Sequence, residues 1–222
     1  MKVIIACEES QAVCIEFRKL GHEAFSCDIQ DCSGGHPEWH IKGDCLEAIN
    51  LKEWDLMIAH PPCTYLSNAG IGWFNEEKYG DKAKERKKER IKGLEFFMKL
   101  WNCKIPKICI ENPTGWANSH FRKPDQIIQP WQFGDTESKR TCLWLKNLPL
   151  LDHCKEPNLF CDKPTHVKPK IYGYYKTGNK KGCPIYGNSY LQFSEDRGKI
   201  RSKTYSGIAK AFATQYGGDL TF

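Results

Sequence analysis

The sequence lacks any long apolar run. No window approaches the roughly 18 apolar residues that a membrane-spanning helix requires, so no membrane span is predicted. An export signal is also missing, because the opening segment MKVIIACEES turns acidic too early for a signal peptide. Internal repeats and low-complexity tracts are absent as well. We therefore expect a soluble protein that stays in the cytosol.

The paired cysteines of a zinc knuckle are also missing. Twelve cysteines are scattered over the 222 residues, and without an export signal most of them should be reduced and buried as small apolar groups. The one cluster that suggests zinc lacks a C-x₂₋₄-C pair. Its members are His153, Cys154, Cys161, His166 and Cys183. We predict no metal site there, and a structural metal is the alternative.

The composition excludes a disordered or fibrous chain, since 40% of the residues are hydrophobic and 27% are charged. The length suits a single domain over residues 1–222 with one sizeable core. The net charge of +6 is uneven. Residues 163–203 carry ten Lys and Arg against Glu195 and Asp196, which suits a polyanion partner. A solvated loop face explains this charge equally well.

Apolar runs alternate with helical patterns along the first half of the chain. Strands are predicted at residues 2–7, 22–29, 55–60, 106–112 and 142–145, and helices at 13–20, 43–49, 76–101 and 204–217. This order predicts an α/β fold with a doubly wound, mostly parallel sheet. We expect loops at residues 31–40, and we interpret residues 146–200 as a loop-rich basic insertion.

Polar residues follow several predicted strands, at the sheet edge where ligands bind in such folds. Asp28 and Asp44 lie there, and so does the strand-end segment Glu111-Asn112-Pro113. For these carboxylates, capping of a local turn or helix is the alternative role. The segment His60-Pro61-Pro62-Cys63 holds a thiol stiffly just past its strand, because proline fixes φ. That thiol is a candidate nucleophile, and a buried inert thiol is the alternative.

The segments DLMIAHPPCTYLS and KICIENP resemble the DNA cytosine-C5 methyltransferases, especially their short phage and prophage members. Six further segments share this resemblance, which therefore covers most of the chain: CEESQAV, SCDI, GDCLEAI, PDQIIQPWQFG, TCLWLKNLP and RSKTYSGIA. The resemblance implies a Rossmann-like, S-adenosylmethionine-dependent methyltransferase fold. It also implies double-stranded DNA as the partner and the cytosol of a bacterial host as the location.

The resemblance further implies the catalytic roles. Cys63 adds to cytosine C6, and Glu111 holds a proton at N3, which requires burial to raise its carboxyl pKa. A basic residue, Lys139 or Arg140, stabilises the cytosine carbonyl. The predicted catalytic residues are thus Cys63, Pro62, Glu111, Asn112 and Arg140, with Lys139 as the alternative to Arg140.

The cofactor half of the site departs from the family pattern. The turn Ala6–Gln11 contains none of the glycines that let a backbone approach its ligand closely. By resemblance, Asp28 bonds the ribose hydroxyls and Asp44 meets the adenine amine. The predicted cofactor-binding residues are Cys7, Glu8, Ser10, Asp28, Asp44 and His60. A helix over residues 205–215 is expected to pack beside the first strand and complete this pocket.

A duplex substrate requires the target cytosine to be flipped out of the stack. The loop from Thr64 to Glu76 is placed to close over that base, with Tyr65 and Trp73 lining the pocket or packing in the core. We expect phosphate contacts from residues 76–92 and 163–203, with 146–200 as a minimal target-recognition region. The lysines concerned are Lys168, Lys170, Lys176, Lys180 and Lys181.

Two alternatives stay open, and a third is disfavoured. The chain could modify a free cytosine nucleotide, since it has little room for a separate target-recognition domain. It could also be an inactive nucleic-acid-binding paralogue, which the altered first loop and the basic stretch favour. An adenine amino-methyltransferase is disfavoured, because His60 and Cys63 stand where that class has its diagnostic residues.

Overall fold

A computed structural model describes residues 1–155, 163–187 and 204–218. Seven strands within these ranges form one sheet in the order β3-β2-β1-β4-β5-β7-β6. They are β1 (Lys2–Ala6), β2 (Glu23–Asp28), β3 (His40–Lys42), β4 (Leu56–Ala59), β5 (Lys107–Pro113), β6 (Gln126–Ile128) and β7 (Thr141–Lys146). Neighbours from β3 to β5 pair in parallel, whereas β7 runs antiparallel to β5 and β6. The predicted doubly wound, mostly parallel sheet is confirmed.

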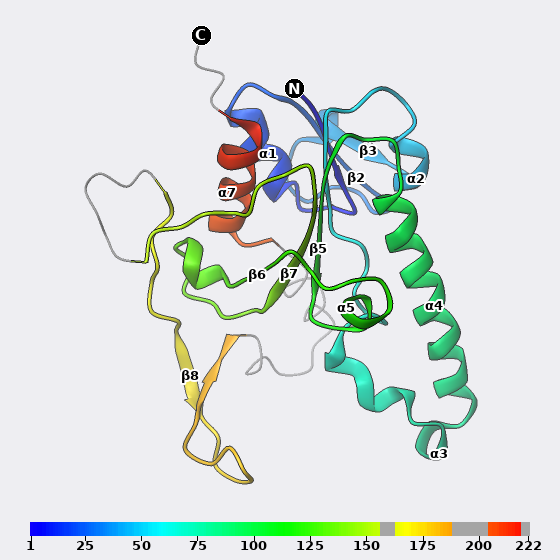
Figure 1. Cartoon of the computed structure of the whole chain (residues 1–222), viewed down its shortest axis with the longest axis vertical. Coiled ribbons are helices and arrows are strands. Elements are labelled where there is room, and N and C mark those ends of the chain that lie inside the picture. Colours follow the sequence, from blue (N-terminus) through cyan, green and yellow to red (C-terminus); the bar gives the residue numbers. More distant parts are fainter. Residues whose placement is uncertain (156–162, 188–203, 219–222) are drawn as a thin grey trace.

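Helices cover both faces of the sheet (Figure 1). They are α1 (Ala12–Lys19), α2 (Cys45–Ala48), α3 (Glu76–Tyr79), α4 (Asp81–Trp101), α5 (Trp116–His120) and α7 (Ser206–Gly217). The single helix predicted over residues 76–101 is wrong in one respect. Gly80 adopts φ 52°, a left-handed conformation that ends α3 and turns the chain into α4. No described helix is both long and apolar enough to cross a membrane.

The central strands are buried on both faces, which explains why their sequences read as continuous apolar runs. Ile5 of β1 packs in one hydrophobic cluster with Phe17 of α1 and Phe212 of α7. Its neighbour Ile4 points the other way, into a second cluster that contains Phe97 of α4. Alternate residues of each central strand therefore hold the two helical layers onto the sheet.

The strand register brings the predicted site residues into one line. Ala6 of β1 pairs with Cys27 of β2 and with Ala59 of β4, and Ala59 pairs in turn with Ile110 of β5. The next residue of each strand therefore lies at the same edge: Asp28, Cys7, His60 and Glu111. The strand order reverses between β1 and β4, and ligands bind at this switch point in open α/β sheets.

Three short elements were not expected from the sequence. Strand β3 begins at the end of the predicted loop 31–40, and β6 pairs with β7 at the sheet edge. The interpretation of residues 146–200 as loops is wrong for part of the described chain. There β8 (Ile171–Tyr174) and β9 (Pro184–Tyr186) form an antiparallel hairpin that extends away from the sheet (Figure 1). The rest of the basic stretch, residues 188–203, lies outside the described residues.

Gly207 in the first turn of α7 permits a close backbone approach. A Cβ atom there would lie 1.9 Å from the carbonyl oxygen of Phe133. Alanine favours a helix over glycine by roughly 1 kcal/mol, yet we expect Gly207→Ala to lower the free energy of unfolding by about 1–3 kcal/mol through overpacking. Chemical denaturation measures this change. Gly72→Ala is the control, because its Cβ would meet nothing within 4 Å, and equal stability of both variants would contradict the packing of α7.

Candidate active site

Cys63 lies on a tight turn that follows β4. The His60 amide donates to the Ala6 carbonyl at 2.9 Å, which extends the β1–β4 pairing to the start of the turn. After the two prolines, the Cys63 carbonyl accepts from the amides of Leu66 at 3.1 Å and Ser67 at 2.8 Å. The Cys63 side chain is exposed, so the alternative of a buried inert thiol is wrong. The turn displays this thiol at the carboxyl edge of the sheet.

Glu111 and Asn112 on β5 face this turn. The Nδ1 atom of His60 lies 3.2 Å from Oε2 of Glu111, and these side chains are only 10% and 13% exposed. The Asn112 amide nitrogen donates to the Pro61 carbonyl at 2.7 Å. Two side-chain contacts thus join the end of β5 to the segment that carries Cys63.

Three buried polar atoms beside these contacts lack a hydrogen-bond partner within the described part of the chain. They are Nε2 of His60, Oε1 of Glu111 and Oδ1 of Asn112. An unsatisfied buried donor or acceptor costs about 1–3 kcal/mol, and such atoms are rare in native proteins. Three of them on two adjacent strand ends indicate a site that a polar ligand completes.

The pKa of Glu111 shifts in the direction opposite to the one expected from the sequence. Burial raises the pKa of this carboxyl, but the nearby Lys139 ammonium and the contact with His60 outweigh burial, so the pKa lies below its ordinary value. The predicted raised pKa is therefore wrong in sign, because it counted burial and omitted the two basic groups. Lys139 is the basic residue whose charge reaches Glu111, whereas the side chain of Arg140 is exposed.

A second buried carboxylate lies on the other side of His60. Glu8 is 3% exposed, and its oxygens accept from the amides of Val13 at 2.7 Å and Cys14 at 3.2 Å, at the start of α1. Burial raises the pKa of Glu8, while the charge of His60 and the two amides act against this rise. His60 is therefore within electrostatic reach of two carboxylates, one on each neighbouring strand end.

In the turn between β1 and α1, two residues other than glycine adopt backbone angles that glycine usually adopts. Cys7 and Gln11 adopt φ of 61° and 58°, in the left-handed region that disfavours most side chains. Side-chain contacts hold this conformation. The Cys7 amide donates to Sγ of Cys45 at 3.2 Å, and the buried Gln11 amide group bonds both the carbonyl and the amide of His36, at 2.8 and 3.0 Å.

The other predicted cofactor residues have local roles that the structure records. Asp28 accepts from the Gln30 amide at 2.9 Å, and Asp44 accepts from the Leu46 amide at 2.8 Å as the N-cap of α2. Both carboxylates therefore make the local capping contacts that were the alternative to cofactor binding. Asp28 remains part-exposed at the end of β2, Asp44 is exposed, and Ser10 lies in the turn before α1.

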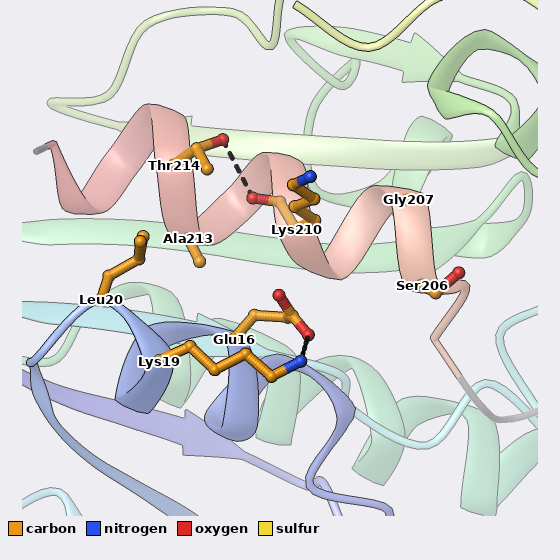
Figure 2. Close-up of a pocket in the computed structure, with 8 residues that line it drawn as sticks. All are labelled: Glu16, Lys19, Leu20, Ser206, Gly207, Lys210, Ala213 and Thr214. Atoms are coloured by element: carbon orange, nitrogen blue, oxygen red, sulfur yellow. Dashed lines mark hydrogen bonds and ion pairs between the residues drawn. The ribbon is translucent and has the colours of Figure 1, made fainter.

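The C-terminal helix α7 packs against α1 and shares a hydrophobic cluster with Val3 and Ile5 of β1, as expected. Between α1 and α7 lies an open pocket of about 510 Å³ (Figure 2). Its lining residues are Glu16, Lys19, Leu20, Ser206, Gly207, Lys210, Ala213 and Thr214. None of the predicted site residues lines this pocket, so it is distinct from the site at the strand ends.

The His/Cys cluster that suggested zinc has other contacts. His153 Nδ1 lies 2.8 Å from His166 Nε2, and Cys154 is disulfide-bonded. Cys161 lies outside the described residues, within which no group of three or more His, Cys, Asp or Glu side chains could hold a metal ion. Ten other cysteines are thiols, and five of them are buried.

Two arginines that the sequence did not single out attach the loop after Cys63 to α4. Arg90 is buried, and its Nε donates to the Tyr65 carbonyl at 3.0 Å. Its guanidinium carbon lies 3.2 Å from the ring centre of Phe74 and 4.5 Å from that of Trp116. Arg86, one turn earlier, covers the Tyr65 ring at 4.9 Å. Nothing in the charged sequence of α4 distinguishes these two arginines from the lysines around them.

No known family model matches the chain, and no curated protein matches it. Several solved structures are similar in fold. The methyltransferase EhMeth of Entamoeba histolytica is 15% identical, with 77% of this chain and 58% of that chain covered and a TM-score of 0.48. A DNMT2 mutant of Spodoptera frugiperda is 16% identical, with 78% and 56% covered and a TM-score of 0.44.

A proposed DNA modification methyltransferase encoded within a prophage of E. coli is 12% identical, with 65% and 46% covered and a TM-score of 0.42. The chain thus spans about half the length of the solved structures that it matches.

The position of the loop after Cys63 depends on Arg90. Arg90→Lys keeps a positive charge but loses the planar stacking on Phe74 and Trp116, so we expect the free energy of unfolding to fall by about 1–3 kcal/mol. Hydrogen exchange should accelerate at the amides of residues 64–74. The control is Lys88→Ala on the solvent side of α4, where the side chain is 71% exposed. Unchanged exchange in Arg90→Lys would show that this arginine does not hold the loop.

Proposed function

We propose that this protein transfers a methyl group from S-adenosylmethionine to C5 of cytosine in double-stranded DNA. The observation that carries this proposal is the set of three unpartnered buried polar atoms, on His60, Glu111 and Asn112, beside the exposed Cys63 thiol. Enzymes read a flipped base by hydrogen bonds to its Watson–Crick edge. The amino group and ring nitrogen of cytosine on that edge offer a donor and an acceptor to such atoms.

In the proposed reaction, the Cys63 thiolate adds to C6 while Glu111 holds a proton at N3, so that negative charge leaves the ring. C5 becomes nucleophilic and takes the methyl group. A base then removes the C5 proton, the C5–C6 double bond re-forms, and the thiolate leaves. Lys139, whose charge acts on Glu111, is the basic residue that we assign to this pocket in place of Arg140.

S-Adenosylmethionine supplies an electrophilic methyl group on a sulfonium ion. The residues at the ends of β1 and β2 fit this cofactor. The positive φ angles of Cys7 and Gln11 give this turn the backbone conformation that glycines would otherwise adopt. Asp28 offers a part-exposed carboxylate of the kind that bonds ribose hydroxyls, and Asp44 is an exposed carboxylate just after β3 for the adenine amine. Glu8 is engaged by α1, so we assign it a structural role and a favourable charge behind the site.

The β8–β9 hairpin supports a polymeric substrate over a free nucleotide. Lys176, Lys180 and Lys181 lie in the connection between its strands, and Tyr174 on β8 is 58% exposed. Lysines bind phosphates and exposed aromatic rings stack on bases. The base of the hairpin is attached close to Lys139, since the Lys170 amide donates to the Thr136 carbonyl at 2.7 Å.

The loop after Cys63 offers a second surface for the substrate. In Figure 1 this loop, which leads to α3, and the hairpin both extend from the lower side of the sheet. Trp73 is 54% exposed and Ile71 is 61% exposed, so neither packs in the core. Such exposed apolar side chains on the loop that follows the nucleophile support closure of this loop over a flipped base.

Duplex DNA that contains 5-fluorocytosine tests the proposed chemistry. Fluorine cannot leave C5 as a proton does, so the protein with S-adenosylmethionine should form a covalent adduct that survives a denaturing gel. Cys63→Ser should abolish the adduct and leave cofactor affinity, measured by calorimetry, within a few-fold of the original. Cys103→Ser, which alters a part-buried thiol just after α4, is the matched control and should form the adduct normally.

The remaining outcomes separate the alternatives. A band with free 5-fluoro-dCMP and none with duplex DNA would support the nucleotide-level enzyme. Binding of DNA without any adduct would support an inactive nucleic-acid-binding paralogue. Loss of cofactor affinity together with the adduct in Cys63→Ser would contradict the assignment of Cys63 as the nucleophile.

The hairpin lysines should contact phosphates. Replacement of Lys176, Lys180 and Lys181 by Gln should weaken DNA binding and lower the slope of log K against log salt by about 0.9 per lost phosphate contact. A charge-matched control replaces Lys2 at the start of β1, Lys19 at the end of α1 and Lys104 in the connection between α4 and β5. Fluorescence anisotropy over a salt series measures both slopes, and equal slopes would exclude the hairpin from the interface.

A further inference from the structure

We infer that His60 carries the proton that Glu111 delivers to N3 of the substrate base, and that it is not a cofactor ligand. This inference rests on the proposed cytosine chemistry and adds a proton-carrying positioning residue to it. It accounts for two features that the proposed function leaves unexplained. These are the ionised state that the surroundings favour for Glu111 and the burial of an imidazole between two carboxylates.

The contact between the two side chains is direct. Nδ1 of His60 lies 3.2 Å from Oε2 of Glu111, in the register line that places the ends of β4 and β5 side by side. The second ring nitrogen of His60 and the second oxygen of Glu111 are both buried and unpartnered within the described residues. His60 and Glu111 therefore contact each other through one atom each, and a second polar atom of each side chain remains available to a ligand.

Glu111 by itself is poorly suited to hold a proton. Its pKa lies below the ordinary value because Lys139 and His60 outweigh the effect of burial. A carboxylate ionised at neutral pH cannot donate to N3 unless a neighbouring group supplies the proton. His60 is in direct contact with Glu111 at 3.2 Å, and imidazole is the side-chain type that commonly carries protons in catalysis.

Ionisable groups on the neighbouring elements act on this pair. On the β1 side, the buried Glu8 carboxylate interacts with His60, and on the β5 side Glu111 does so. From the segment before β7, the Lys139 ammonium lowers the pKa of Glu111. Two carboxylates flank one imidazole, so the group as a whole can hold a shared proton that belongs to no single residue.

The proton balance of the step is simple. At the start the imidazole carries the shared proton and the Glu111 carboxylate is ionised. As Cys63 adds to C6, the imidazole loses one proton, the Glu111 carboxyl group passes one proton on, and N3 gains one. The imidazole ends neutral and the carboxylate is unchanged. When Cys63 leaves and the ring recovers its aromatic character, N3 returns the proton to the pair.

The pH dependence of adduct formation separates this role from simple positioning of Glu111. The proposed step needs a proton on the His60–Glu111 pair, so the wild-type rate should fall as the pH rises. In His60→Gln the amide can still hydrogen-bond Glu111 but carries no exchangeable charge. We expect the rate with 5-fluorocytosine DNA at pH 7.5 to fall about 10²-fold, within the usual range for general acid catalysis, and the decline with pH to begin in the acidic range.

Two controls keep the result interpretable. Binding of S-adenosylhomocysteine to His60→Gln should stay within a few-fold of wild type, which a cofactor ligand at this position would not allow. If the Gln variant does not fold, His60→Gly takes its place, and added imidazole should restore the rate in proportion to the imidazolium concentration. Positioning alone would produce no such dependence on imidazolium.

The failure of this inference differs from the failure of the proposed function. A wild-type protein that forms no adduct at any pH contradicts the cytosine chemistry itself. If wild type forms the adduct and His60→Gln shows the same pH dependence as wild type, only the role of His60 is overturned. The same holds if added imidazole fails to restore the rate of His60→Gly.

Discussion

The parallel pairing of β1, β4 and β5 is the constraint on which the site depends. The backbone bonds of this ladder align Ala6, Ala59 and Ile110, so the residues that follow each of them emerge at one edge of the sheet. A slip of one residue in any pair would turn every side chain of that strand to the opposite face. The buried apolar faces of these strands exclude such a slip, and the same core therefore determines which polar residues meet.

The aligned strand ends create an electrostatic environment that no single residue has on its own. His60 contacts the buried Glu111 carboxyl group and interacts electrostatically with the buried Glu8, while Lys139 acts on Glu111 from the segment before β7. In a poorly solvated site, neighbouring ionisable groups shift one another's pKa values. The protonation state of Glu111 is thus a property of the group, and burial alone predicts it wrongly.

Sequence patterns predicted the central strands and the long helices because those elements are buried on one or both faces over many residues. They missed β3, β6 and the β8–β9 hairpin, whose three or four residues form strands only through a partner. Gly80 was not recognised as the break before α4, because the charged residues on both sides favour a helix equally. Cys63, Glu111 and Asp28 could be identified as strand-end residues, whereas Arg86 and Arg90 could not be distinguished from the lysines of the same helix.

The sequence by itself determined the order of strands and helices and which polar residues follow the apolar runs, since both depend on local pattern and chain direction. The tertiary structure decided what those residues do. It selected Lys139 over Arg140 as the basic group near Glu111. It also placed His60 against Glu111 across a sequence separation of 51 residues. Contacts of this kind depend on distances between strands that are far apart in the chain, and no local pattern encodes them.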